Sequence, residues 1–308
     1  MEARRRIAGE VETTPLRQVR IGGNAVWLKC ENRQTGGAFK LRGASNRLLM
    51  MDAAERARGV VAFSSGNHAR GVAIAARRLG IAATIVMPSD APAVKVDATR
   101  AEGAEIIFYD RRLESREEIA AALASETGAT VVPSFDDPAI VAGQGTVGLE
   151  ILDQLKALKE RPPTQIVVPC GGGGLAAGIA LACPDAAMVL VEPEGWDDMG
   201  RSLGAGEIVP VAPDASPTLC DALQTPRVSP ITFGILRARD ATAMWVSEAE
   251  VEQAVRFAWR ELREQVEPGG AVALAALLAG KVEANPGTVA ILSGGNIDPA
   301  LHARIVGE

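Results

Sequence analysis

The sequence predicts an α/β protein built from mostly parallel sheets that are covered by helices. Short apolar runs alternate with amphipathic segments along almost the whole chain of 308 residues. The runs are apolar at successive positions, which is typical of strands buried on both faces of a parallel sheet. No internal repeat, low-complexity tract or linker interrupts the pattern. The length suffices for one large domain or two ordinary ones.

In the first half, apolar runs predict strands at 60–63, 83–87, 105–109 and 130–133. The segments between them predict helices over 69–79 and 91–102, and a further helix that begins at Arg116. Ser115 is placed to cap this last helix, and Glu118 at its third position would complete a capping box. The order of these segments is that of successive βα units, which favours parallel pairing.

The second half repeats this alternation. Strands are predicted at 165–169, 188–191 and 288–292, and helices at 174–182, 248–265 and 270–279. The stretch 203–235 contains several prolines and is predicted to be irregular. The stretch 140–146 is punctuated by glycines and is interpreted as a crossing between domains.

Composition excludes several classes of partner. The net charge is −6 and no Lys/Arg tract stands alone, so a nucleic-acid-binding surface is not expected. No apolar run approaches the ~20 residues that span a bilayer, and no apolar segment follows the charged N-terminus as a secretory signal would require. The four cysteines are scattered without metal-type spacing, which predicts reduced thiols in a cytoplasmic protein.

Lys40 is the first candidate for chemistry. It lies between Phe39 and Leu41, with small residues on both sides. Burial lowers the pKa of an ammonium, and a neutral lysine amine is a nucleophile that can form a Schiff base. The alternative is a surface lysine at the start of a basic helix.

A tetraglycine loop, formed by Gly171, Gly172, Gly173 and Gly174, is the second candidate. It follows an apolar strand and precedes a helix, so backbone N–H groups and a helix N-terminus converge on it. No Gly-Lys-Ser/Thr follows as in a P-loop, and the glycines are contiguous rather than spaced as in a dinucleotide fingerprint. The sequence therefore predicts a phosphate site, with a tight strand-to-helix turn as the alternative. An amine and a phosphate site in one chain indicate pyridoxal phosphate.

Two further polar stretches follow predicted strands. The first, which we call the serine loop, consists of Ser64, Ser65, Gly66, Asn67 and His68. It is suited to bind a carboxylate or to hydrogen-bond a ring oxygen, although it would also serve as an ordinary helix cap. Ser293, at the end of the last predicted strand, is suited to hydrogen-bond a buried ring nitrogen, with a simple turn as the alternative.

These motifs occur together in a specific order. Lys40 lies within Gly-Ala-Phe-Lys-Leu-Arg-Gly-Ala, and Ser293 begins Ser-Gly-Gly-Asn. Together with the two loops they resemble the fold-type II pyridoxal-phosphate enzymes, in particular the threonine/serine dehydratase and serine racemase group. Further stretches match that group: Thr14-Pro15-Leu16, 28–32, 142–146 and 267–271. The resemblance covers nearly the whole chain.

The resemblance implies a fold and a cofactor site. The fold would have two open, mostly parallel twisted sheets flanked by helices, with a large domain of residues 1–45 and 142–308 and a small inserted domain of residues 46–141. Lys40 would hold pyridoxal phosphate as a Schiff base, with Phe39 against the ring and the phosphate in the tetraglycine loop. Asn67 would hydrogen-bond the pyridine hydroxyl, and Ser293 would face the pyridine nitrogen. Relatives of this type are commonly dimers or tetramers, and a homodimer is expected.

The resemblance also implies the substrate contacts. The serine loop would bind the carboxylate of a small amino acid. Ser65 would lie on the opposite face of the cofactor from Lys40, where serine racemases use a serine as the second acid/base. Arg116 resembles a substrate-side arginine and would meet an acidic side chain such as that of 3-hydroxyaspartate; the alternative is an exposed residue in a helix's first turn.

A divalent-cation site is implied by the segment 192–198. Related enzymes bind Mg²⁺ or Ca²⁺ there with a glutamate, a backbone carbonyl and an aspartate. The corresponding ligands would be Glu192, the carbonyl of Trp196 and Asp198, a set of oxygen ligands that suits hard cations including Mn²⁺. A solvated acidic loop is the alternative.

Three positions depart from the pattern of the group. Gly36-Gly37-Ala38 replaces a hydroxyl-containing stretch before Phe39, Cys220-Asp221-Ala222 replaces Ala-Asp-Gly, and Gly269 replaces Ala, Ser or Thr. These departures leave the cofactor assignment intact, but they count against plain threonine or serine as the preferred substrate.

The sequence therefore predicts a pyridoxal-phosphate-dependent dehydratase, or ammonia-lyase. It would convert a small β-hydroxy amino acid, such as L-Thr, L-Ser or 3-hydroxyaspartate, into a 2-oxo acid and ammonia by β-elimination. The main alternative is a hydroxy-amino-acid racemase that uses Lys40 and Ser65 as an acid/base pair on the two faces. A non-catalytic phosphate-binding protein and a β-replacement synthase are less favoured, the first because of Lys40 and the second because of the cation segment.

Overall fold

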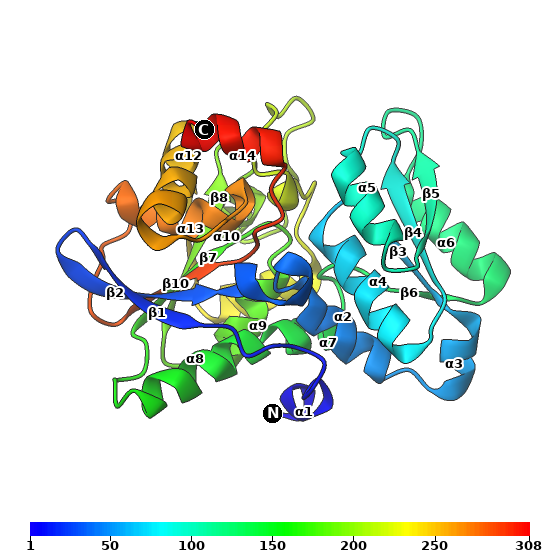
Figure 1. Ribbon diagram of the computed structural model, residues 1–308, viewed down its shortest axis with the longest axis horizontal. Coiled ribbons are helices and arrows are strands. Elements are labelled where there is room, and N and C mark those ends of the chain that lie inside the picture. The colour runs from blue at the N-terminus through cyan, green and yellow to red at the C-terminus, as the bar shows by residue number, and fades with distance from the viewer.

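The computed structural model describes all residues from 1 to 308 and contains two sheets flanked by helices (Figure 1). The large sheet has the strand order β1-β2-β10-β7-β8-β9, and only β1 and β2 pair antiparallel. Its strands are β1 (Leu16–Ile21), β2 (Asn24–Cys30), β7 (Gln165–Pro169), β8 (Ala187–Pro193), β9 (Thr242–Val246) and β10 (Thr288–Leu292).

The small sheet is parallel throughout and has the order β5-β4-β3-β6. Its strands are β3 (Val60–Phe63), β4 (Ala83–Pro88), β5 (Glu105–Tyr109) and β6 (Thr130–Val131). The predicted α/β fold class with two mostly parallel sheets is confirmed. The domain boundaries expected at 45/46 and 141/142 stay a prediction, although the small sheet is formed entirely within 46–141.

The helices cover both sheets and connect them. They are α1 (Glu2–Arg6), α2 (Lys40–Leu49), α3 (Ala53–Arg58), α4 (Asn67–Leu79), α5 (Ala93–Arg100), α6 (Arg116–Thr127), α7 (Pro138–Gln144), α8 (Thr146–Ala157), α9 (Gly174–Ala182), α10 (Asp198–Ala205), α11 (Pro230–Ala238), α12 (Glu248–Phe257), α13 (Pro268–Leu278) and α14 (Pro299–Val306). A short π-helical turn, Ala258–Leu262, follows α12. In Figure 1 the chain leaves the large sheet through α2 and returns through α7. None of the helices combines the length and hydropathy needed to cross a bilayer.

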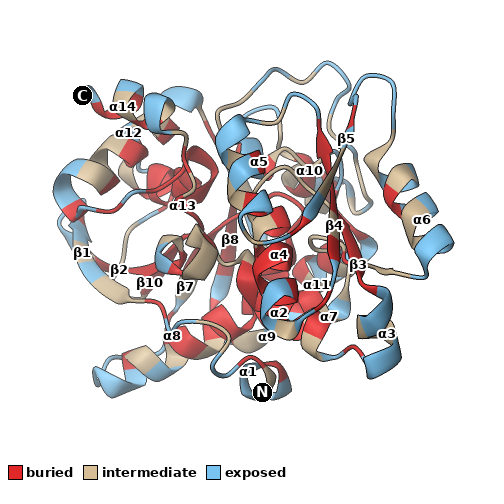
Figure 2. Ribbon diagram, turned by 45° about the vertical axis from the view of Figure 1, so that its right-hand side comes forward, coloured by how far each residue is buried: buried red, intermediate tan, exposed pale blue.

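The large sheet is buried on both faces, which explains its uniformly apolar strands. In β10, Ala290 and Leu292 pack with α12 and α13, whereas Val289 and Ile291 pack on the other side with α8 and α9. Helix α13 is buried along almost its entire length (Figure 2), so it shows none of the polar face that a surface helix carries.

Several elements differ from the sequence prediction. Strands β1, β2 and β9 were not predicted: β1 and β9 are the edges of the large sheet, and edge strands carry mixed polar and apolar residues. The prediction of an irregular 203–235 is wrong at its end, because Ser229 and Pro230 start α11 with a capping box. Ser115 does cap α6 through the Glu118 N–H at 3.2 Å, but the return bond of the predicted capping box is not formed.

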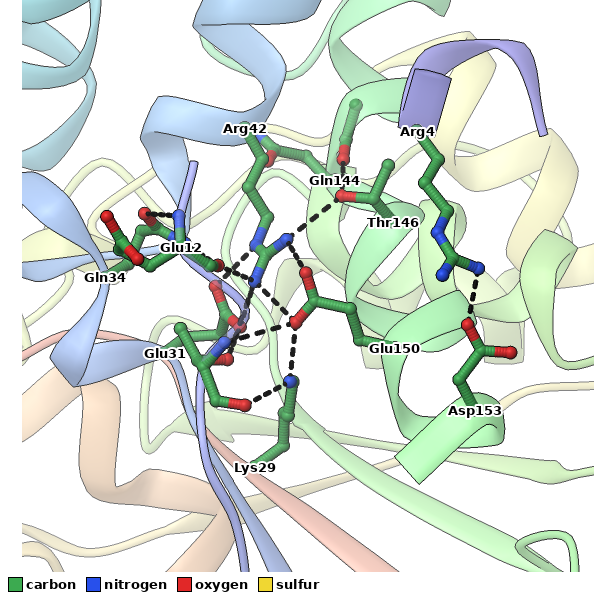
Figure 3. Close-up of polar contacts among 12 residues, drawn as sticks. Arg4, Glu12, Lys29, Glu31, Gln34, Arg42, Gln144, Thr146, Glu150 and Asp153 are labelled. Atoms are coloured by element: carbon green, nitrogen blue, oxygen red, sulfur yellow. Dashed lines mark hydrogen bonds and ion pairs between the residues drawn. The ribbon is translucent and has the colours of Figure 1, made fainter. Parts of the chain in front are cut away.

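A buried ion cluster holds the start of α2 (Figure 3). The Arg42 guanidinium donates to both oxygens of Glu31, at 2.7 and 2.8 Å, and to both oxygens of Glu150, at 2.6 and 2.9 Å. Lys29 donates to Glu150 at 2.6 Å. Burial alone would raise the pKa of Glu150, but the hydrogen bonds and charges of Arg42 and Lys29 hold it below its usual value. The cluster thus joins α2 to β2 and to α8.

Removing one charge from this cluster should be far more costly than removing one at the surface. We expect Glu150→Gln to lower the free energy of unfolding by about 3–5 kcal/mol, because Lys29 and Arg42 stay buried with one carboxylate between them. Asp153→Asn is the matched control, since Asp153 lies on the same helix and pairs with Arg4 at a half-exposed position. It should cost less than about 1 kcal/mol. Urea unfolding of both variants measures the difference, and equal losses would contradict the prediction.

Candidate active site

A cavity of about 860 Å³ lies between the two sheets, at the carboxyl ends of β3, β7 and β10. In parallel sheets the loops that follow these strand ends form the usual ligand site. The cavity is lined by residues from both halves of the molecule, including Phe39, Lys40, the whole serine loop, Arg116, the whole tetraglycine loop, Glu267 and Ser293. The structure therefore brings together every residue that the sequence analysis assigned to cofactor and substrate. The three cation ligands are not among the lining residues.

Lys40 is the first residue of α2 and is held from two sides. The preceding Phe39 donates its backbone N–H to the Ser293 carbonyl at 3.2 Å, which ties the start of α2 to the end of β10. The Lys40 Nζ donates to the Ser134 carbonyl at 3.0 Å and lies 5.2 Å from the centroid of the Phe39 ring. No carboxylate pairs with it, and burial lowers its pKa to about 8. About a tenth of the amine is therefore neutral, and nucleophilic, at pH 7, far more than of an ordinary lysine.

The tetraglycine loop joins β7 to α9, lines the cavity with its backbone and packs closely against Phe135. Gly173 has a φ of 82°, a conformation that side-chain-bearing residues rarely adopt. A Cβ on Gly172 would overlap the ring of Phe135, from the segment that leads back to the large sheet. Backbone N–H groups and the N-terminus of the nine-residue α9 face the cavity here, an arrangement that suits a phosphate.

The serine loop joins β3 to α4. Its first residues carry no secondary structure, and Asn67 begins the helix. Ser64 accepts the Gly66 N–H at 3.3 Å, a bond that shapes the turn, and Ser65 lines the cavity. The N-terminal end of the 13-residue α4 thus faces the same cavity as Lys40. Such a helix end attracts a carboxylate.

His68 is buried and its ring is engaged. Its Nε2 bonds the Val132 carbonyl at 2.9 Å, so this nitrogen carries the proton. Burial first, and then the charge of Lys40, lower its pKa to about 3. The neutral ring has no second N–H to offer a substrate, so any contact of His68 with a carboxylate would use its backbone N–H.

Glu267 is a cavity residue to which the sequence analysis gave no role. Its side chain is only 2% exposed, and its Oε1 accepts from the Asn67 Nδ2 at 2.5 Å. Burial, and then the negative charge of Asp221, raise its pKa to about 7, opposed by Lys95 and by the bond from Asn67. The only signal in the sequence was that Glu267 begins the matched stretch 267–271.

Arg116 lies at the rim of the cavity as the first residue of α6. Its guanidinium is half-buried, pairs with Glu117 at 2.9 Å and lies 5.5 Å from the Phe63 ring centroid. Its side chain is therefore on the cavity side but already has an anionic partner, which a ligand carboxylate would have to replace.

The predicted cation ligands lie outside the cavity, around the N-terminus of α10. Glu192 and Asp198 are both fully buried, whereas Trp196 is half-exposed. Glu192 accepts the backbone N–H groups of Met199 and Gly200, each at 2.9 Å. Both carboxylate oxygens of Asp198 lack a hydrogen-bonding partner. No group of three or more histidine, cysteine, aspartate or glutamate side chains comes together anywhere in the structure.

The residues of the cavity fit pyridoxal phosphate. A desolvated amine, a glycine cradle at a helix N-terminus and polar side chains for the ring oxygen and ring nitrogen all line one space. The overlap that a Cβ on Gly172 would make shows that the cradle tolerates no larger residue at that position.

Comparison with known proteins agrees with this fit. The family described as pyridoxal-phosphate dependent enzyme matches residues 7–294. The chain is 42% identical to an L-threo-3-hydroxyaspartate ammonia-lyase of a Pseudomonas species, over 99% of this chain and 97% of the relative. It is 39% identical to an L-threonine ammonia-lyase of Thermotoga maritima, over 94% of this chain and 71% of the relative. The structure of maize serine racemase superposes with a TM-score of 0.90 at 35% identity, covering 98% of this chain and 94% of that one.

The chain belongs to the family of pyridoxal-phosphate dependent enzymes. The predicted resemblance to fold-type II enzymes is confirmed, as are the predictions of pyridoxal phosphate as the cofactor and of a dehydratase-like lyase.

The low pKa of Lys40 makes the stability of the cofactor-free protein depend on pH. Below pH 8 the folded protein holds a desolvated ammonium, which costs stability. Between pH 8 and 10.5 the folded protein has released this proton while the unfolded chain still binds it, so the cost is relieved as the pH rises. We expect Lys40→Met to be more stable than the wild type at pH 7, by an amount that shrinks to nothing by pH 10.5.

Urea unfolding of the cofactor-free proteins from pH 7 to 10.5 tests this expectation. Lys156→Met, on the exposed face of α8, controls for the loss of one surface charge. If the difference in free energy of unfolding between Lys40→Met and the wild type were the same at every pH in this range, the amine would not be desolvated.

Proposed function

We propose that this protein is an ammonia-lyase that eliminates water from a small β-hydroxy amino acid and releases a 2-oxo acid and ammonia. The observation that carries the proposal is the position of Lys40, whose unpaired amine shares one cavity with the phosphate-type glycine loop and the serine loop. Support comes from the relatives, among which ammonia-lyases for 3-hydroxyaspartate and threonine are prominent.

The protein's own groups are suited to the proton transfers of this reaction. Bound in the cavity, pyridoxal phosphate would withdraw electrons from the substrate's α-carbon and make its proton acidic. The Lys40 amine, with a pKa of about 8, is matched to remove that proton and to return it near neutral pH. The Ser134 carbonyl orients the amine through its 3.0 Å hydrogen bond.

The serine loop would orient the substrate. A carboxylate at the N-terminus of α4 receives backbone N–H groups and the positive end of the helix dipole. Ser64 and Ser65 add hydroxyl donors beside it. A substrate held in this way would present its α-carbon to the amine of Lys40.

The substrate side chain would face the part of the rim that holds Arg116. The cavity is lined by Lys95, Arg111, Arg116 and Arg227 and by as many acidic side chains, of which Asp221 pairs with Lys95 and Glu117 with Arg116. We propose that Arg116 exchanges Glu117 for the second carboxylate of 3-hydroxyaspartate. An exposed ion pair contributes little, so this exchange is inexpensive.

Racemisation is the second candidate function, and Ser65 is the observation that favours it. Ser65 lines the cavity that holds Lys40, and it belongs to the other half of the molecule. A hydroxyl on the opposite face of the α-carbon would return the proton with inverted stereochemistry. The similarity to maize serine racemase supports this alternative.

We further propose a divalent cation, Mg²⁺ or a similar hard ion, held by Glu192, the Trp196 carbonyl and Asp198. The two unpartnered oxygens of Asp198 support this proposal. Burying a carboxylate without hydrogen-bond donors costs free energy, and a bound cation would offset that cost. A homodimer in the cytoplasm is part of the same proposal.

A coupled assay tests the reaction. We expect stoichiometric 2-oxo acid and ammonia from one of L-Thr, L-Ser, D-Ser and threo- or erythro-3-hydroxyaspartate, with 3-hydroxyaspartate preferred. Arg116→Gln should lower kcat/KM for 3-hydroxyaspartate by about tenfold or more and leave serine turnover nearly unchanged, because only the diacid loses a charged hydrogen bond. Arg112→Gln is the control, since this exposed neighbour does not line the cavity.

Chiral analysis of the remaining substrate distinguishes the alternative. Exchange of enantiomers without ammonia, abolished in Ser65→Ala, would make the protein a racemase and contradict the proposed elimination.

Thermal unfolding tests the cation. Mg²⁺, Ca²⁺ or Mn²⁺ should raise the Tm of the wild type, because an ion at a hundred times its Kd stabilises the folded state by about 2.7 kcal/mol. Asp198→Asn should abolish the rise, whereas Asp197→Asn should retain it, because Asp197 pairs with Arg201 at the half-exposed neighbouring position. A rise that persists in Asp198→Asn would place the ion elsewhere.

A further inference from the structure

The side-chain amides of Asn67 and Asn296 form a hydrogen-bonded chain that starts at Glu267. The Asn67 Nδ2 donates to Glu267 at 2.5 Å, and the Asn67 Oδ1 accepts from the Asn296 Nδ2 at 2.7 Å. Asn67 comes from α4 beside the small sheet, whereas Glu267 and Asn296 come from the segments before α13 and after β10. The contacts therefore bridge the two halves of the molecule at the cavity wall.

Asn296 can adopt only one orientation of its amide. Its Nδ2 also donates to the Gly36 carbonyl at 2.8 Å, and its Oδ1 accepts from the Arg70 Nη1 at 3.1 Å. A backbone carbonyl only accepts hydrogen bonds and a guanidinium only donates them. Exchanging the oxygen and nitrogen of Asn296 would set two acceptors against each other at Gly36 and two donors against each other at Arg70.

The orientation of Asn296 fixes that of Asn67. Because Asn296 presents its Nδ2, Asn67 must present its oxygen, and its own Nδ2 then points to Glu267. An amide nitrogen has two hydrogens, and the contact with Glu267 uses one of them. The second remains for a ligand in the cavity, so Asn67 offers a donor there and not an acceptor.

The backbone of a neighbouring segment packs closely against the Asn296 amide. Gly37 has a φ of 76°, and a Cβ placed on it would overlap the Asn296 amide. The Gly295 N–H donates to the Gly37 carbonyl at 2.8 Å, which holds the two segments together. Asn296 is thus confined by contacts that do not involve Asn67.

We propose that Asn296, held by Arg70 and the Gly36 carbonyl, is a positioning residue that sets Asn67 with an N–H donor toward the cofactor. This inference rests on the proposed placement of pyridoxal phosphate beside Asn67. The donor would meet a ring oxygen that carries negative charge, and a reversed amide would place its oxygen against that charge.

A double-mutant cycle on cofactor binding tests the proposal. Asn296→Asp keeps the shape of the side chain but removes the donor, so Asn67 must turn its Nδ2 toward residue 296. We expect Asn296→Asp to weaken the binding of pyridoxal phosphate to the cofactor-free protein about five- to tenfold and to shift the visible absorption of the bound cofactor. In an Asn67→Ala background the same substitution should cause no further loss.

Two controls separate positioning from general damage. Asn285→Asp adds the same charge at a site where the side-chain oxygen makes the contacts, with Thr164 and Gly287, and it should leave the affinity unchanged. Arg70→Lys keeps a donor for Asn296 and should bind nearly as the wild type does, whereas Arg70→Met should bind less tightly. If Asn296→Asp does not fold, the cofactor affinities of these Arg70 variants still test whether the orientation of Asn296 matters.

The outcomes are distinct. Unchanged affinity in Asn67→Ala would overturn both the placement of the cofactor beside Asn67 and the inference. Weaker cofactor binding in Asn67→Ala would support the placement of the cofactor beside Asn67. If Asn296→Asp then lowered the affinity by the same factor in the wild-type and Asn67→Ala backgrounds, the inference about Asn296 would be overturned while the placement would stand. No loss from Asn296→Asp alone, or an equal loss from Asn285→Asp, would also overturn it.

Discussion

The site depends on how α2 is held where it leaves the large sheet. Arg42, two residues after Lys40, is buried between Glu31 and Glu150, where its bidentate contacts fix the first turn of the helix. The returning helix α7 approaches so closely that a Cβ on Gly143 would lie 2.6 Å from the Arg42 carbonyl and from the Gly43 Cα. Charge and close backbone packing thus fix both crossings between the sheets. Lys40 receives a defined position from residues that do not themselves line the cavity.

Desolvation gives the cavity its chemical character. Burial shifts the amine of Lys40, the imidazole of His68 and the carboxyl of Glu267 toward their neutral forms. Groups of this kind exchange protons near neutral pH or stay uncharged, and their concentration in one cavity is typical of an active site. The contacts of Asn67 with Glu267 and Asn296 add direction to this environment, because they fix which end of the Asn67 amide donates and which accepts.

Much of the fold and the site was predictable from short patterns. The limits of α9 at 174–182 follow from a glycine run before it and an apolar run within it, and the structure has the same limits. The tetraglycine loop, the serine loop and Ser293 each followed a predicted strand, so parallel pairing was enough to place them at the carboxyl ends of strands, where ligand sites form. The edge strands β1 and β9 escaped prediction because their pattern mixes polar and apolar residues. Helix α11 was not predicted because the nearby prolines were interpreted as signs of a loop, although Pro230 is the first residue of the helix.

By itself, the sequence determined the fold class, the cofactor and the candidate residues that line the cavity, because these depend on local patterns and on motifs of specific order. It did not determine the roles of Glu267 and Asn296. Asn67 and Glu267 are separated by 200 positions, and Asn67 and Asn296 by 229. Their hydrogen bonds exist only because the fold brings the start of α4 beside the segments that precede α13 and follow β10. An amide orientation or a burial-shifted pKa is set by neighbours in space, so only the tertiary structure decided them.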